Sequence, residues 1–174
     1  MPAPLEFALA VLVLIAAAYD LRFRRIPNWL NVAGVLTGIV LNALPFTHSG
    51  VRTALIGVLV ALLVYGPLYL LRAMGAGDVK LMGAVGAIVG PQQWLLIFLC
   101  SAIAGGLFAV FVSLRRGRLR QTLSNVAILG SELMQFRSPA QHHESLDVRS
   151  HRSLRLPHGL AIAAGSLAFL LLHG

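Results

Sequence analysis

The sequence predicts an all-α, polytopic membrane protein with about six transmembrane helices, an N-terminus outside and one amphipathic helix in the membrane interface. The chain is 57% hydrophobic and 11% charged, with a mean hydropathy of +0.81, whereas a soluble domain carries roughly a quarter charged residues. Long apolar runs recur along it, and its arginines gather in clusters between those runs. The length suits one membrane domain, residues 1–174.

The expected spans are the segments that approach about 20 apolar residues, the length that crosses a bilayer. They lie at about residues 4–19, 29–46 and 51–71, in two parts of the run 81–114, and at about 156–172. Gly90-Pro91 marks a turn that divides the long run into a fourth and a fifth helix. The fourth helix is short unless it begins near Gly77, and a membrane-embedded hairpin is the alternative to two full spans.

The stretch between the last two spans is rich in arginine, and we expect it to form a cytoplasmic loop over residues 115–155. Within it, apolar residues recur at helical spacing between Leu119 and Met134, with polar residues on the opposite side. This pattern is typical of a helix that lies in the membrane interface. Residues 138–155 are expected to form a mobile loop.

The basic residues predict the orientation of the spans. Clusters at residues 22–25, at Arg72 with Lys80, and over 115–155 follow the first, third and fifth spans. Cytoplasmic loops carry an excess of Lys and Arg, so six spans with both termini outside satisfy this rule at every loop. Trp29 and Trp94 are expected to be interfacial anchors on opposite faces, since tryptophan is enriched there.

The composition also argues against several other functions. The net charge of +8 lies in interhelical clusters, not in a basic patch, which argues against nucleic acid as a partner. Cys100 is the single cysteine, so neither a disulfide framework nor a thiolate metal site can form. The histidines in and beside the arginine-rich loop, among them His142, His143 and His158, have no ordered spacing. We therefore expect no metal and no cofactor.

Two aspartates are the candidate catalytic residues. Asp20 closes the first span and Asp78 lies in the glycine-rich loop before the fourth, so both are predicted at the cytoplasmic edge of the bilayer. Acidic residues at membrane depth are rare and mark functional sites. The alternatives are that Asp20 merely ends a span and that Asp78 caps a helix, since aspartate favours N-caps.

A pair of adjacent aspartates suits hydrolysis of a peptide bond. Like charges about 3 Å apart cannot both ionise, so the pair holds one proton. The ionised carboxylate takes a proton from water and the protonated one donates to the scissile carbonyl oxygen. The two roles cannot be divided between Asp20 and Asp78, because such a pair titrates as a unit.

Residues around the pair are candidates for substrate binding or structural support. Gly75 and Gly77 closely precede Asp78 and permit the approach of a substrate backbone. Lys80 is expected either to contact substrate and tune the pair or to anchor the loop at the headgroups. Pro27 is expected to start the second helix, with Asn28 satisfying a backbone group.

These motifs resemble the type IV prepilin peptidases, in particular the short forms that process Flp-type pilins. The resemblance rests on YDLRFRRIPNWL at residues 19–30, GAGDVKLMGAVGAIVGP at 75–91 and LPHGLAIAAG at 156–165. It covers nearly the whole chain in order and spacing. His158 is a departure, because an aromatic residue is more usual there.

The resemblance implies an aspartic endopeptidase of the bacterial inner membrane that cleaves prepilin leaders at the cytoplasmic face, just after a glycine, through Asp20 and Asp78. The longer members carry a domain with zinc-binding cysteines and also N-methylate the new terminus; this chain has one cysteine, so we expect no methyltransferase activity. The partners are then a prepilin and the bilayer, and a homo-oligomer is left open. The competing functions are a non-catalytic subunit of a pilus or secretion machine, a proton-coupled transporter, and a sister protease that cuts remnant signal peptides.

Overall fold

The computed structural model describes residues 1–44, 48–70, 74–115, 117 and 158–173. These residues form five helices and no strand, so the predicted all-α class is confirmed for them. The helices are α1 (Ala3–Phe23), α2 (Asn28–Ala43), α3 (His48–Leu70), α4 (Ala76–Arg115) and α7 (His158–His173). The expected interfacial helix and the loop at 138–155 lie outside the described residues.

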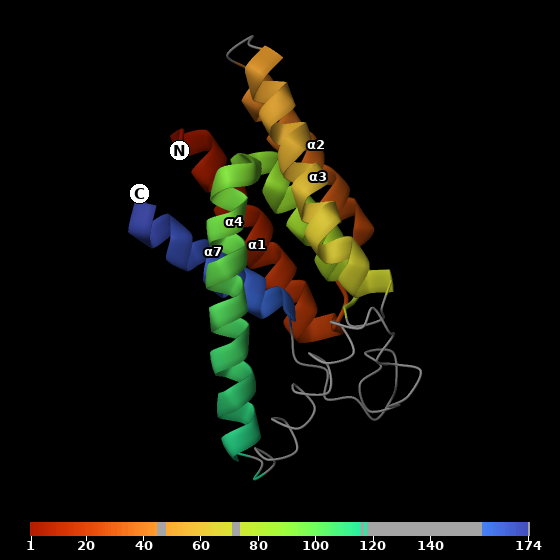
Figure 1. The fold of residues 1–174 in the computed structure, drawn as a ribbon, viewed down its shortest axis with the longest axis vertical. Coiled ribbons are helices and arrows are strands. Elements are labelled where there is room, and N and C mark those ends of the chain that lie inside the picture. Colours follow the sequence, from red (N-terminus) through yellow and green to blue (C-terminus); the bar gives the residue numbers. More distant parts are fainter. Residues whose placement is uncertain (45–47, 71–73, 116, 118–157, 174) are drawn as a thin grey trace.

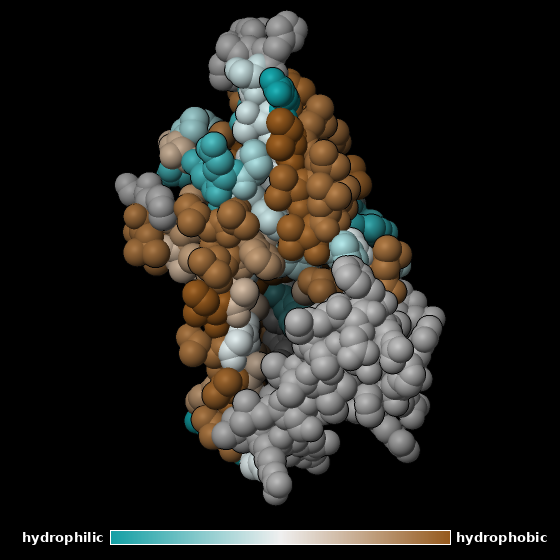
Figure 2. Space-filling model, viewed as in Figure 1, coloured by the Kyte–Doolittle hydropathy of each residue, from teal (hydrophilic) through white to brown (hydrophobic). Residues whose placement is uncertain are grey.

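The described helices have the length and the surface of a membrane protein. Helices α1, α3 and α4 are long and apolar enough to cross a membrane, and α2 and α7 are shorter apolar helices. Large apolar side chains are exposed along all five, for example Phe7, Leu63 and Leu107, and Figure 2 shows them across much of the viewed face. Apolar surface on this scale needs a nonaqueous neighbour. The number of spans and the side of the N-terminus stay predictions.

Helix α4 is two limbs that fold back on each other at Gly90. That residue has φ 76° and ψ 174°, a conformation that glycine tolerates, and Pro91 opens the second limb. Figure 1 shows the turn between the limbs. The predicted break therefore exists, and the first limb begins at Ala76, inside the glycine-rich loop. Residues 76–89 make about 21 Å of helix, less than the hydrocarbon thickness of about 30 Å.

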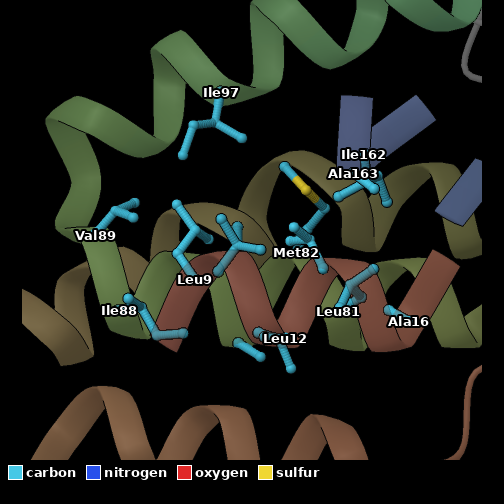
Figure 3. Packing of buried hydrophobic residues seen from close by; sticks show 14 of the residues in the cluster. Leu9, Leu12, Ala16, Leu81, Met82, Ile88, Val89, Ile97, Ile162 and Ala163 are labelled. Carbon is cyan, nitrogen blue, oxygen red and sulfur yellow. The ribbon is translucent and has the colours of Figure 1, made fainter. Parts of the chain in front are cut away.

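The first limb of α4 is the centre of the fold. Residues 81–90 are all buried, because α1, α2, α3, α7 and the second limb surround them. Figure 3 shows Leu9 and Leu12 of α1, Leu81 and Met82 of the first limb, and Ile97 of the second converging on one core. An apolar sequence on every side of a helix is what such a buried position requires.

Glycines let α2 and α3 approach this limb closely. A Cβ at Gly38 of α2 would lie 2.6 Å from the backbone carbon of Ala87, and one at Gly57 of α3 would overlap the carbonyl oxygen of Gly86. Small residues permit such approach of helix backbones in membrane proteins. The path of the first limb is thus fixed on two sides by backbone contact.

Two side chains hold the turn at Gly90 in place. The amide nitrogen of Asn42 donates to the carbonyl oxygens of Ala87 and Ile88, at 3.2 and 3.1 Å, where the first limb ends. The indole nitrogen of Trp94 donates to the carbonyl oxygen of Met82 at 3.0 Å. Trp94 is fully buried, so its prediction as an interfacial anchor is wrong. The turn carries it back against the first limb, into the core.

Candidate active site

Asp20 lies in the last turn of α1 and is 8% exposed. The helix ends at Phe23, because Arg24 adopts the left-handed conformation (φ 51°) and its N–H donates to the carbonyl oxygen of Asp20 at 2.9 Å. The carboxylate of Asp20 accepts a hydrogen bond of 2.8 Å from the backbone N–H of Gly159, in the first turn of α7. A buried carboxylate is therefore held by a group from the far end of the chain.

Asp78 lies at the third position of α4, in its first turn. The carbonyl of Gly75 accepts a bond from the N–H of Val79 as the helix opens, and the N–H of Gly75 donates to the carboxylate of Asp78. This is the reach of a third-position acid back to the N-cap. Asp78 is thus not the N-cap residue, but its side chain accepts a hydrogen bond from the backbone of the N-cap residue.

The fold brings the two aspartates to one end of the bundle. Asp78 interacts electrostatically with both Asp20 and His158, although the three residues come from α4, α1 and α7. In Figure 1 the C-terminal end of α1 lies beside the start of α7. The buried Tyr65 of α3 also interacts electrostatically with Asp78, and its ring packs edge-on against Trp94 and Phe98.

The predicted supporting residues surround this pair. Lys80 donates from Nζ to Oδ1 of Asn28 at 2.9 Å, which links α4 to the start of α2. Pro27 is the extended N-cap residue before α2, and Asn28 is its first helical residue. The expectation that Asn28 satisfies a backbone group stays a prediction, and the structure adds its contact with Lys80.

Two of the three glycines at the site stand where a side chain would collide or crowd. A Cβ at Gly159 would lie 2.9 Å from Oδ2 of Asp20 and 3.1 Å from its Cγ, and one at Gly75 would lie 3.2 Å from Oδ2 of Asp78. Gly77 faces Ile26 at ordinary contact distance. Gly159 and Gly75 each bring a backbone N–H against a carboxylate, which explains why these positions suit glycine.

Sequence reasoning missed three residues of this site: Gly159, His158 and Tyr65. The Pro-His-Gly start of the last span was noticed, but no local signal says that it meets Asp20. Among the described residues no group of three or more His, Cys, Asp or Glu could hold a metal ion. His142 and His143 lie outside them, so the absence of a metal stays a prediction.

A sequence model of the type IV leader peptidase family matches residues 7–110, which include Asp20 and Asp78. The chain belongs to this family. Neither the curated proteins nor the solved structures contain a match. As a leader peptidase the protein is a protease whose substrate is a prepilin, and its apolar helices make it an integral membrane protein. The matched region ends before α7, so the hydrogen bond from Gly159 to Asp20 comes from the structure and not from the family comparison.

Proposed function

We propose that the protein is a membrane aspartic endopeptidase that cleaves the leader of a prepilin, of the Flp type, at the cytoplasmic face, with Asp20 and Asp78 as the catalytic pair. The observation that supports the proposal is the electrostatic interaction between these two carboxylates, which lie far apart in the sequence and on different helices. Membership of the leader peptidase family supplies the reaction class.

The mechanism follows from one proton shared by two carboxylates. The ionised carboxylate accepts a proton from water as the water oxygen attacks the scissile carbonyl carbon. The other carboxyl donates its proton to the carbonyl oxygen, and collapse of the tetrahedral intermediate breaks the C–N bond as the nitrogen takes up a proton. Backbone N–H groups from Gly159 and Gly75 bond to the pair and stabilise its charged form.

We further propose six spans in one domain, residues 1–174, in the bacterial inner membrane, with both termini outside. The five helices provide six apolar segments when α4 is divided at Gly90. On this topology the end of α1 and the start of α4 face the cytoplasm, where clustered arginines belong. The proposed supporting residues are Gly75, Gly77, Lys80, Pro27 and Asn28. The single Cys100 supports a peptidase without methyltransferase activity.

Co-expression with a candidate small prepilin, followed by N-terminal sequencing and mass measurement of the product, tests the proposal. We expect Asp20→Asn and Asp78→Asn each to lower cleavage at least about a hundredfold, because each removes one half of the acid–base pair. Both variants should accumulate in the membrane like the wild type. The product of the wild type should begin just after a glycine and carry no methyl group.

Glu6→Gln is the matched control, because Glu6 pairs with the N-terminal amine at 3.4 Å in the first turn of α1, at the opposite end of that helix from Asp20. It should cleave at the wild-type rate. Cleavage that survives either aspartate change would refute the aspartic mechanism, and a methylated product would refute the restriction to peptidase activity.

A further inference from the structure

The first turn of α7 holds the carboxylate of Asp20. The N–H of Gly159 donates to it at 2.8 Å, and a hydrogen bond of this kind needs donor and acceptor at about 3 Å and nearly in line. The position of α7 is therefore part of the geometry of the site. That position is set where α7 packs against α1 and α4.

Gly165 of α7 lies directly against the backbone of Ser101 in the second limb of α4, which α7 crosses in Figure 1. A Cβ at position 165 would stand 2.5 Å from the Cα of Ser101 and would also overlap its backbone nitrogen and its hydroxyl oxygen. Two of these three atoms belong to the backbone of a helix, so a change of side-chain rotamer cannot make room. The two helices approach each other at a distance that glycine permits.

A second contact and the apolar core complete the seat of α7. One turn before Gly165, Ala161 faces Gly105 of the second limb, where a Cβ would lie 3.3 Å from the Cβ of Ala161. Ile162 and Phe169, on another side of α7, are buried in the core. The core thus fixes one face of α7, and close contact with the second limb fixes the face that carries positions 161 and 165.

We propose that Gly165 is a positioning residue of the peptidase: its contact with Ser101, supported by that of Ala161 with Gly105, seats α7 so that the N–H of Gly159 meets Asp20. Positions 159 and 165 are about 9 Å apart along one continuous helix, so a displacement at one is passed to the other. The inference rests on the aspartic mechanism proposed above and extends it to a residue that does not touch the pair.

Gly165→Ala in the full-length protein, assayed in liposomes with a prepilin substrate, is the test. To reach ordinary contact distance from Ser101, the new methyl group must push α7 away from the second limb by about 1 Å, and a misplacement of that size can cost a hundredfold in rate. We expect kcat to fall at least about tenfold with little change in KM, because Asp20 acts in the chemical step.

The hydrogen bond itself gives a second readout, independent of activity. In protein that carries isotopically labelled glycine, the NMR signal of the Gly159 amide is identified as the one that Gly159→Ala removes. We expect Gly165→Ala to shift this signal and to speed exchange of its amide hydrogen with solvent, because the donor has moved from the carboxylate. Gly106→Ala, on the same limb as Ser101, is the matched control, since a Cβ there meets nothing within 4 Å. It should leave the signal and kcat unchanged.

A wild-type kcat in Gly165→Ala overturns the proposal, and so does a loss of kcat with an unmoved Gly159 signal, because that is the result of general destabilisation. If Gly165→Ala does not accumulate, Gly105→Ala decides. It should shift the Gly159 signal, and adding Ala161→Gly should return it; failure to do either contradicts the proposal. Cleavage that survives in Asp20→Asn would instead refute the proposed function, so the two failures are distinguishable.

Discussion

Both carboxylates of the candidate site bond to the backbone at a helix N-terminus. Asp20 accepts from Gly159 in the first turn of α7, and Asp78 accepts from Gly75 at the start of α4. Helix N-termini carry partial positive charge and unpaired N–H groups, which suit an anion. The two aspartates are thus held in the same way, by a backbone N–H at a helix start, although they lie on different helices. Neither hydrogen bond has a side-chain donor that a mutation could remove.

Gly159→Ala tests the contact at Asp20. The new Cβ would stand 2.9 Å from Oδ2 and 3.1 Å from Cγ of Asp20, so the carboxylate must move. Since misplacement by about 1 Å can cost a hundredfold in rate, we expect kcat to fall at least about tenfold in the prepilin cleavage assay. Gly106→Ala is the matched control, because a Cβ there meets nothing within 4 Å. Equal rates for the two variants would contradict the assigned contact.

At the scale of the elements, the C-terminal end of the first limb of α4 is held by hydrogen bonds from another helix. The last carbonyls of a helix have no partner within it. Here Ala87 and Ile88 find one in the side chain of Asn42 on α2, which also donates to Gly38 at 2.8 Å. The bonds tie the turn at Gly90 to α2, at the opposite end of the limb from Asp78.

Asn42→Leu should therefore lower stability. The change leaves the carbonyl oxygens of Ala87 and Ile88 without their donor in a partly buried place, a loss of about 1–3 kcal/mol. We expect a lower midpoint of thermal unfolding for the purified protein in detergent, read by circular dichroism. Thr37→Val, on the exposed side of α2, should leave the midpoint unchanged. A midpoint for Asn42→Leu equal to that of this control would show that the bonds contribute nothing measurable.

The sequence was sufficient to predict the apolar helices that the structure describes and the break at Gly90, because hydropathy marks where each apolar run ends and Gly-Pro marks a turn. The side of the membrane on which Asp20 and Asp78 lie stays a prediction. The sequence was not sufficient for contacts that depend on the paths of the helices. Gly159 meets Asp20 across 139 positions, and periodicity carries no information about such pairs. From the sequence alone Trp94 looks like an interfacial residue. In the structure the turn at Gly90 brings its indole nitrogen against the carbonyl oxygen of Met82. The catalytic roles of the aspartates stay predictions.

At the scale of the whole molecule, the proposed topology places both ends of the arginine-rich region and the end of α1 on the cytoplasmic side. Single cysteines at Arg25 and Arg115, both exposed, and at the exposed Ser49 at the start of α3 test it in a Cys100→Ser background. A membrane-impermeant maleimide should label Ser49→Cys in intact cells, and Arg25→Cys and Arg115→Cys only after permeabilisation. The Cys100→Ser parent should remain unlabelled. Labels at 25 and 115 from opposite sides would overturn the topology.

The bond from Gly159 to Asp20 also sets an order of events during biosynthesis. The ribosome makes the chain from its N-terminus, so both aspartates emerge long before the amide that holds Asp20. A nascent chain carries both aspartates but lacks this partner until α7 has been translated, 139 positions after Asp20. The hydrogen-bonded arrangement of Asp20 can therefore form only after α7 has been made.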